Sequence, residues 1–239
     1  MTVDLHSTSA FSKGLLLGTA EGRELTAEFW EKVAKRYAGH PALFGYDLIN
    51  EPHSREIGPG DPALNEQYAH LIGRIRRIDP VTPIIVECDE MSNPAGLPFL
   101  PVFDAPNIIY SIHMYRPHEL THQLDRNASS RLGYPDAARK WDKELLRREL
   151  AVVREFQRRT GARIYVGEFG CIRWAPGAAE YLRDCIDLFE EYGWDWCYHA
   201  FREFQGWSVE LGGAPDKPTP EPDNDRKRVL LEGLKRNRE

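Results

Sequence analysis

Glu51 occupies a position where a carboxylate could take part in catalysis. It follows the apolar stretch 44–49 and the side-chain amide of Asn50, and Pro52 comes directly after it. A proline cannot donate a sheet hydrogen bond and disfavours helical backbone at the residue before it, so the predicted strand should stop at Glu51. Ionised groups are rarely left in apolar surroundings without a partner or a task. The pattern therefore indicates either a catalytic acid or a strand-ending acid that caps the next helix.

Glu168 occupies a similar position near the end of the apolar run 162–170. Gly167 and Gly170 lie close to it and allow the close backbone approach that a crowded site needs. Two carboxylates that face each other across a cleft are the groups required for glycoside hydrolysis. A separation of about 5 Å leads to retention of the anomeric configuration, and about 6.5–9.5 Å leads to inversion. The alternative for Glu168 is again a helix-capping acid.

The elements that must position these carboxylates alternate between strand and helix. Short apolar runs rich in β-branched residues predict six strands, which lie at 1–6, 44–50, 83–88, 107–115, 162–170 and 194–201. Helical spacing predicts a helix capped by Thr26, and further helices at 65–78, 137–160, 178–192 and from about Asn224. The segments 7–22, 54–62, 116–135 and 202–223 read as loops. Strands that are apolar on both faces and alternate with helices indicate a parallel sheet covered by helices.

Two α/β architectures fit this alternation, an open doubly wound sheet and a barrel. The glycine-rich phosphate loop of the dinucleotide-binding open sheet follows none of the strands. Polar residues instead stand at the carboxyl ends of several strands, namely His6, Asn50, Glu51, Glu87, His113, Tyr115 and Glu168. These ends converge on one face of a (β/α) barrel, where active sites are built. We therefore expect residues 1–239 to form a single TIM-type barrel domain of about six βα units.

Three motifs resemble the catalytic strands of family 5 glycoside hydrolases, which are cellulase-type, retaining (β/α)8 barrels. The motifs are Leu-Ile-Asn-Glu-Pro at 48–52, His-Met-Tyr at 113–115 and Tyr-Val-Gly-Glu-Phe-Gly at 165–170; Asp-Leu-His at 4–6 is similar to the end of the third strand of that family. The resemblance implies that Glu51 is the general acid/base and Glu168 the nucleophile. It further implies that Asn50 binds the sugar 2-hydroxyl and that Tyr115 orients Glu168. His113 and His6 would bind sugar or carboxylate, although each could instead be a structural histidine.

The sequence departs from the family pattern at its first residues and near its last strand. It begins inside what resembles strand three, so strands one and two, with the arginine that the family places on strand two, have no counterpart. We expect an incomplete, N-terminally truncated barrel whose exposed edges lead to dimers or higher oligomers. The family usually ends strand eight with a tryptophan that stacks on the sugar. Phe201 or Trp207 could take that place here.

Composition restricts the classes of partner. The chain has a formal net charge of −6 and no basic tract, which argues against nucleic acid. An apolar run long enough to cross a bilayer is absent from the sequence, as is a signal peptide, although the family resemblance implies secretion. The four cysteines have no C-x-x-C spacing and are expected to be buried free thiols. We expect no cofactor and no metal.

The leading hypothesis is a retaining endo-β-1,4-glucanase that acts on β-glucan or a related polysaccharide or oligosaccharide. A β-mannanase of the same family is the near alternative. A catalytically impaired, carbohydrate-binding remnant is the non-enzyme alternative, because strands are missing. A metal-dependent barrel hydrolase built on His6, His113 and Glu168 is disfavoured, since the paired His-x-His ligands common in such sites are absent.

Overall fold

A computed structural model describes residues 1–6, 16–53, 62–123 and 131–238 of the chain. Its main sheet contains six strands, which are β1 (Thr2–Asp4), β2 (Gly45–Asp47), β3 (Ile84–Glu87), β4 (Ile108–Met114), β5 (Arg163–Phe169) and β6 (Asp195–Tyr198). They lie in the order β1-β2-β3-β4-β5-β6, and the pairs from β1 to β4 are parallel. Each of the six strands coincides with a predicted strand to within a few residues.

This strand order distinguishes between the two architectures that the sequence allowed. In a doubly wound sheet the order reverses, so that the first strand lies inside the sheet. Here each strand pairs with its neighbours in the chain, which is the order of a (β/α) barrel. The fold is an incomplete TIM-type barrel of six strands, and the predicted fold class is confirmed.

The chain divides into two compact units, which we call the first unit and the second unit. The first unit consists of Met1–Ile112 and Val152–Tyr165, and the second consists of His113–Ala151 and Val166–Glu239. β4 and β5 each begin in the first unit and end in the second. The site residues at the carboxyl ends of β4 and β5 therefore belong to the second unit.

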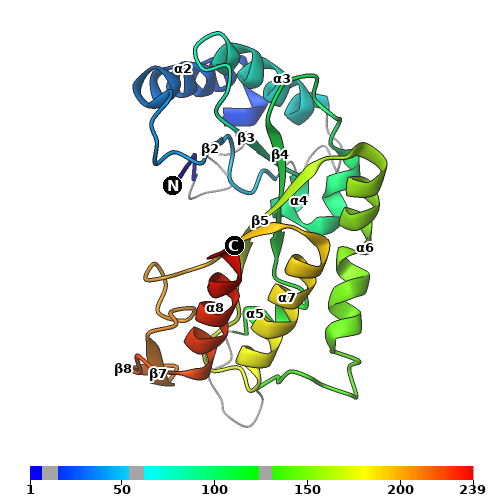
Figure 1. The fold of residues 1–239 in the computed structure, drawn as a ribbon, viewed down its shortest axis with the longest axis vertical. Helices are drawn as coiled ribbons and strands as arrows, with labels where there is room; N and C mark the ends of the chain where they lie inside the picture. The colour runs from blue at the N-terminus through cyan, green and yellow to red at the C-terminus, as the bar shows by residue number, and fades with distance from the viewer. Residues whose placement is uncertain (7–15, 54–61, 124–130, 239) are drawn as a thin grey trace. The chain divides into compact units, whose positions relative to one another are not determined.

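Two helices of the first unit, α2 (Ala20–Tyr37) and α3 (Pro62–Arg76), pack side by side (Figure 1). α2 begins earlier than predicted, because the Thr19 hydroxyl accepts the Gly22 N–H at 2.9 Å and caps the helix. The predicted cap Thr26 is wrong. Thr26 lies inside the helix, where its hydroxyl donates to the carbonyl of Gly22 at 2.8 Å.

The core of the first unit explains why its strands are apolar on both faces. All residues of β2 and β3 are buried. Trp30 of α2 is fully buried and donates its indole N–H to the carbonyl of Leu48 at 3.0 Å, which anchors α2 to the residue after β2. The short helices α4 (Asp89–Ser92) and η1 (Pro94–Phe99) follow β3 directly. Helices thus cover the strands, as the apolar pattern predicted.

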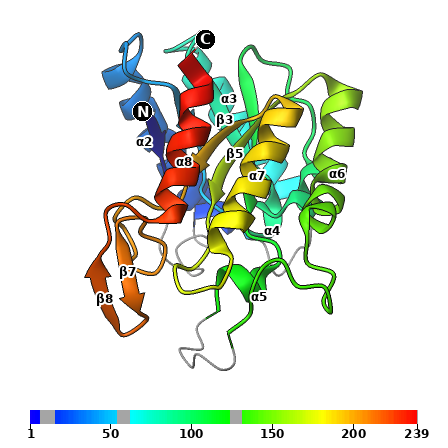
Figure 2. The same cartoon turned by 60° about the horizontal axis from the view of Figure 1, so that its bottom comes forward.

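The second unit contains α5 (His118–Thr121), the start of α6 (Lys143–Thr160), α7 (Ala178–Tyr192) and α8 (Asp225–Lys235), which is followed by η3 (Arg236–Arg238). Figure 2 shows α7 beside α8, with a hairpin of β7 (Leu211–Ala214) and β8 (Lys217–Pro220) near the start of α8. α7 has the predicted bounds, and Asn224 caps α8 as expected. The hairpin and α5 lie in segments predicted to be loops, so those predictions are wrong in part.

The predicted helix 137–160 is also six residues too long. The segment before Lys143 forms a turn in which Asp136 and Trp141 form an isolated antiparallel bridge. The carboxylate of Asp136 accepts the backbone N–H groups of Ala138 and Arg139. An aspartate side chain that satisfies nearby N–H groups stabilises a turn in competition with a helix, which explains the later start.

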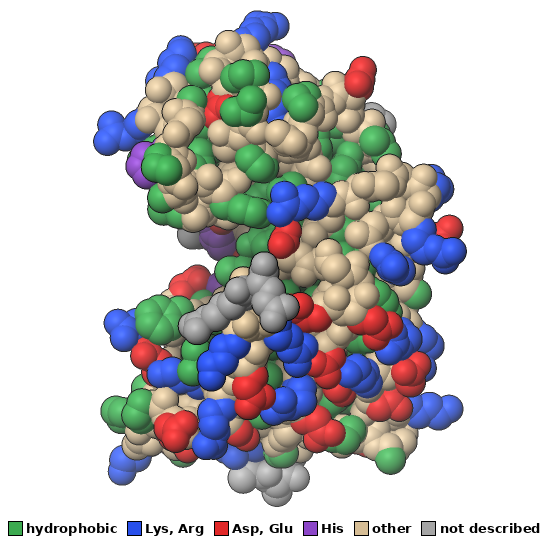
Figure 3. Space-filling model, viewed as in Figure 1, with side chains coloured by type: hydrophobic (Ala, Val, Ile, Leu, Met, Phe, Trp, Pro, Cys, Tyr) green, Lys and Arg blue, Asp and Glu red, His purple; other side chains and the backbone are tan. Residues whose placement is uncertain are grey.

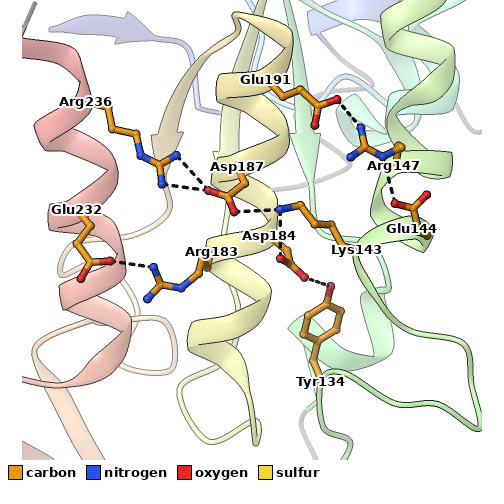
Figure 4. Close-up of polar contacts among 10 residues, drawn as sticks. All are labelled: Tyr134, Lys143, Glu144, Arg147, Arg183, Asp184, Asp187, Glu191, Glu232 and Arg236. Atoms are coloured by element: carbon orange, nitrogen blue, oxygen red, sulfur yellow. Dashed lines mark hydrogen bonds and ion pairs between the residues drawn. The ribbon is translucent and has the colours of Figure 1, made fainter.

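The helices of the second unit carry intermixed acidic and basic side chains on their surface (Figure 3). Lys143 of α6 contacts Asp184 and Asp187 of α7, and Arg236 reaches Asp187 from the end of α8 (Figure 4). Isolated surface ion pairs contribute little, but shared partners such as Asp187 form a network. The network ties α6 and η3 to α7.

The four cysteines are free thiols, and Cys88, Cys171 and Cys185 are buried as predicted. Cys197 is exposed, which corrects the prediction for that residue. Its strand β6 alternates between exposed and half-buried positions, so this side chain is not enclosed. Among the described residues, no helix is both long and apolar enough to cross a membrane.

Candidate active site

Glu168 lies at the centre of a polar cluster in the second unit. The Tyr115 hydroxyl donates to Glu168 Oε2 at 2.8 Å, and His199 Nδ1 lies 2.8 Å from the same oxygen. Tyr115 and His199 also contact each other, with 2.7 Å between the hydroxyl and Nδ1. His113 Nδ1 is 3.7 Å from Glu168 Oε2. One carboxylate oxygen therefore faces several groups that can donate a proton or carry positive charge.

The electrostatics of this cluster keep Glu168 ionised. Burial alone would raise the pKa of Glu168. The hydrogen bond with His199, the positive charges of His113 and His199 and the hydrogen bond from Tyr115 outweigh burial and lower that pKa to about 2. A carboxylate that is largely buried yet ionised has the properties of a nucleophile or an electrostatic stabiliser, not of a proton donor.

An aromatic wall borders this cluster. The Trp207 ring stacks on Tyr115 at 5.8 Å between centroids and meets the His199 ring at 5.4 Å. The Trp207 indole N–H donates to the carbonyl of Thr121 at 3.2 Å, which fixes the orientation of the ring. Phe201, the other candidate from the sequence, is 59% exposed and lies under the guanidinium of Arg202. Of the two, Trp207 is the one beside Tyr115.

His122 completes the wall and differs electrostatically from His199. Its ring lies against Trp207 at 4.9 Å and stacks on His118 at 4.0 Å. Burial, followed by the nearby charge of His118, lowers the pKa of His122 to about 4, although Glu168 opposes this change. His122 is thus neutral near pH 7.

Asn50 and Glu51 belong to the first unit and follow β2. The Asn50 side chain is buried, and its backbone N–H donates to the carbonyl of Leu5 at 3.1 Å. Glu51 has a φ of 46°, which is unusual for a residue with a side chain. Its backbone N–H donates to Glu87 Oε2 at 2.7 Å, and Glu87 is 1% exposed. The buried carboxylate of Glu87 thus stabilises the backbone conformation that presents Glu51.

Glu87 is itself held by other residues of the first unit. The Ser92 hydroxyl donates to Glu87 Oε2, the same oxygen that accepts the Glu51 N–H. The Tyr68 hydroxyl donates to the carbonyl of Glu87 at 2.8 Å.

His6 follows β1, the strand that pairs with β2. Its side chain is 45% exposed, and its Nδ1 is 3.1 Å from Asp4 Oδ2. This carboxylate is two residues away in the chain, so the role predicted for His6 at the site stays a prediction.

Comparison with models of known families gives a match over most of the chain. A sequence model described as cellulase, glycosyl hydrolase family 5, matches residues 1–205. The chain belongs to glycoside hydrolase family 5.

Relatives of this family 5 chain carry glucanase names. Endoglucanase C of Acetivibrio thermocellus is 25% identical over 226 residues, which cover 80% of this chain and 65% of that protein. The endoglucanase Cel5A of the hyperthermophilic Thermotoga maritima is 27% identical, with a TM-score of 0.76 over 98% of this chain and 71% of that one. The same enzyme in complex with mannotriose aligns with 25% identity and a TM-score of 0.74, again over 98% of this chain and 71% of that one. The family 5 chain thus spans about 65% of the length of that curated relative.

The sequence predicted no role for three residues around the family 5 site. Two of them are His199 and its second partner, Glu203. His199 directly follows β6, so it stands at the carboxyl end of a strand, as the predicted site residues do. Glu87 was noted at the end of β3, but its contact with the Glu51 N–H depends on a residue 36 positions away in the chain. Neighbouring sequence carries no signal for such a contact.

Proposed function

We propose that this chain is a retaining glycoside hydrolase of the endo-β-1,4-glucanase type, with Glu168 as nucleophile and Glu51 as general acid/base. The observation that carries the proposal is the environment of Glu168. This carboxylate is held ionised by Tyr115, His113 and His199 and has an aromatic wall beside it. The family to which the chain belongs supports the same assignment.

The reaction proceeds by two displacements. In the first, the Glu168 carboxylate attacks the anomeric carbon while Glu51 donates its proton to the departing glycosidic oxygen, which forms a glycosyl ester on Glu168. In the second, the ionised Glu51 takes a proton from water as the water oxygen attacks the anomeric carbon. The ester bond breaks, the carboxylate of Glu168 is restored, and the two inversions give net retention.

The other site residues have supporting roles in this proposal. Asn50 binds the 2-hydroxyl of the sugar, where hydrogen bonds strengthen in the transition state. Tyr115 orients Glu168 through its 2.8 Å hydrogen bond. His113 and His6 bind sugar hydroxyls or carboxylates, and Trp207 offers an aromatic face to the C–H surface of the sugar.

Glucan is the substrate class that the names of the relatives favour. Endoglucanase C and Cel5A are both named for action on glucan. Mannan is the second candidate, since the Cel5A enzyme of Thermotoga maritima was crystallised with mannotriose. Because the chain spans about 65% of the length of the curated relative, a carbohydrate-binding remnant with impaired catalysis is the competing outcome.

The test replaces each proposed catalytic carboxylate by its amide. Glu168→Gln and Glu51→Gln should each lower reducing-sugar release from carboxymethylcellulose by about 10²-fold or more, because each loses a group needed in the bond-breaking step. Glu232→Gln, at an exposed ion pair on α8, is the matched control and should retain activity. Near-normal turnover in either site variant would refute the carboxylate pair.

Parallel assays separate the alternatives. The first anomer released should be β, as read by proton NMR, if the enzyme retains configuration. Comparison of carboxymethylcellulose with mannan decides between glucanase and mannanase. Loss of activity on treatment with a chelator would support the metal-dependent hydrolase instead. An inactive wild-type chain that still binds cello-oligosaccharide would identify the remnant.

A further inference from the structure

His199 has a carboxylate at each of its two ring nitrogens. Nδ1 lies 2.8 Å from Oε2 of Glu168, and Nε2 forms a hydrogen bond with Oε2 of Glu203. The His199 side chain is largely buried, with 19% of its surface exposed, whereas Glu203 is mostly exposed. A histidine therefore connects the proposed nucleophile with a surface carboxylate four residues further along the chain.

The number of protons decides which form of the ring fits this arrangement. A neutral imidazole has a single N–H, so it would turn a lone pair toward one of the two carboxylates. The imidazolium has an N–H on each nitrogen and can donate to Glu168 and Glu203 at once. The Tyr115 hydroxyl lies 2.8 Å from Glu168 Oε2 and 2.7 Å from His199 Nδ1, and its single proton can serve only one of them. When it donates to Glu168, Nδ1 needs a proton of its own to face the same carboxylate oxygen.

From this geometry, and resting on the proposed function, we infer that His199 is a positioning residue that stays protonated between Glu203 and Glu168. In this role it keeps Glu168 ionised and oriented for attack, and Glu203 keeps the charge on His199. The residue acts through Glu168 and takes no part in bond breaking.

The groups around His199 are consistent with this assignment. Glu168 from β5 and Glu203 from the segment after β6 favour its charge, and they raise the pKa of His199 although burial would lower it. His113 from β4 and His122 after α5 lie near the same carboxylate, and the charge of His199 helps to lower the pKa of His122. His122 is neutral, with a pKa of about 4, and its Nδ1 lies 2.9 Å from the Thr121 hydroxyl. His199 thus has one carboxylate partner at each ring nitrogen, Glu168 at Nδ1 and Glu203 at Nε2.

The first experiment follows the ring nitrogens of His199 by ¹⁵N NMR as the pH is raised, with the signal assigned by its loss in His199→Asn. In the wild-type chain the ring should lose its proton above the ordinary histidine value of about 6.5. In Glu203→Gln the titration should move down by about one unit, because one carboxylate partner is lost. This exposed substitution does not threaten the fold. A wild-type ring that is neutral at pH 7, or a titration unchanged in Glu203→Gln, would overturn the inference.

The second experiment measures the ionisation of Glu168 and its consequence. His199→Asn keeps an N–H donor near the position of Nδ1 but removes the charge. The substitution should raise the pH at which Glu168 loses its proton, as followed by ¹³C NMR. It should also shift the acid limb of the pH profile of kcat/KM upward by about one pH unit. Glu203→Gln should leave that limb in place, since His199 is still charged at acid pH. A merely structural role for His199 would lower activity equally at all pH values, and that result would overturn the inference.

Failure of this inference can be told apart from failure of the proposed function. The two NMR titrations need no substrate, so they test His199 even if the chain releases no sugar. An active enzyme with an acid limb that does not move in His199→Asn would refute the role of His199 and leave the glycosidase assignment intact.

Discussion

At the scale of single residues, two histidines of the second unit show how partners decide charge. His122 packs against aromatic rings and the imidazole of His118, and its pKa is lowered to about 4 by burial and by that neighbour. His199 faces two carboxylates, which raise its pKa. Both rings contact Trp207. The difference in charge therefore comes from the polar groups around each ring.

The lowered pKa of His122 predicts a loss of stability in mild acid. Between pH 6.5 and about 4 the unfolded chain binds a proton at His122 that the folded chain does not, so stability falls as the pH falls through this window. After allowance for solvent screening, we expect about 1–2 kcal/mol of the free energy of unfolding to be lost. His199 does not change the free energy of unfolding in this pH window, because below its ordinary pKa it is charged in both the folded and the unfolded chain. Glu168 contributes only below its ordinary value of 4.5.

Urea denaturation at pH 6.5 and pH 4 measures this loss. His122→Asn keeps a polar group near Nδ1 and removes the titration, so the difference in unfolding free energy between the two pH values should shrink. An equal difference in wild type and variant would contradict the prediction.

At the scale of elements, Asn224 joins α8 to the β7–β8 segment. Its side-chain oxygen accepts the Lys227 N–H at 3.0 Å and caps the helix. Its amide nitrogen donates to the carbonyls of Val209 and Glu221 at 2.6 and 2.7 Å. Asn224→Ala should lower the free energy of unfolding by about 2–3 kcal/mol, because it removes a cap and leaves two carbonyls without this donor.

The aspartate variant divides this effect into its parts. Asn224→Asp keeps an oxygen for the cap but loses the amide donor, so its unfolding free energy in urea denaturation should lie between wild type and Asn224→Ala. A loss below about 0.5 kcal/mol in the alanine variant would mean that α8 is held by other contacts, such as those of Arg226 with Ser208 and Leu211.

At the scale of the whole molecule, the main sheet of the described residues ends in β1 and β6, and within those residues each of these two strands has one neighbour. A sheet edge exposes backbone N–H and C=O groups that can pair with another chain. We therefore predict that copies of this chain associate, and that light scattering gives at least twice the monomer mass of 27.5 kDa. The backbone groups of Met1 and Leu5 bond to the β2 side, so by alternation the N–H of Thr2 faces away from β2. Thr2→Pro would remove this donor and should weaken association through that edge. A monodisperse monomer of the wild-type chain would contradict the prediction.

The sequence by itself determined the elements and the kind of chemistry. Apolar runs gave the six strands, and the helix 178–192 was predicted without error, since it ends at Gly193 in the left-handed conformation that glycine favours. The Asn-Glu-Pro and Gly-Glu-Phe-Gly motifs identified the candidate carboxylates. These features depend on residues close together in the chain, where spacing and backbone preference are decisive. The start of α2 was missed because two threonines could cap it, and the choice of Thr19 over Thr26 was not fixed by their type.

Only the tertiary structure decided which groups surround each carboxylate. Tyr115 and His199 are 84 positions apart, yet both contact Glu168, and Glu87 reaches the N–H of Glu51 across 36 positions. Such contacts arise where parallel strands bring their carboxyl ends together, and the residues between them in the chain carry no record of the partner. The charge state of Glu168 follows from these partners, so it is a property of the fold and not of the motif that contains it.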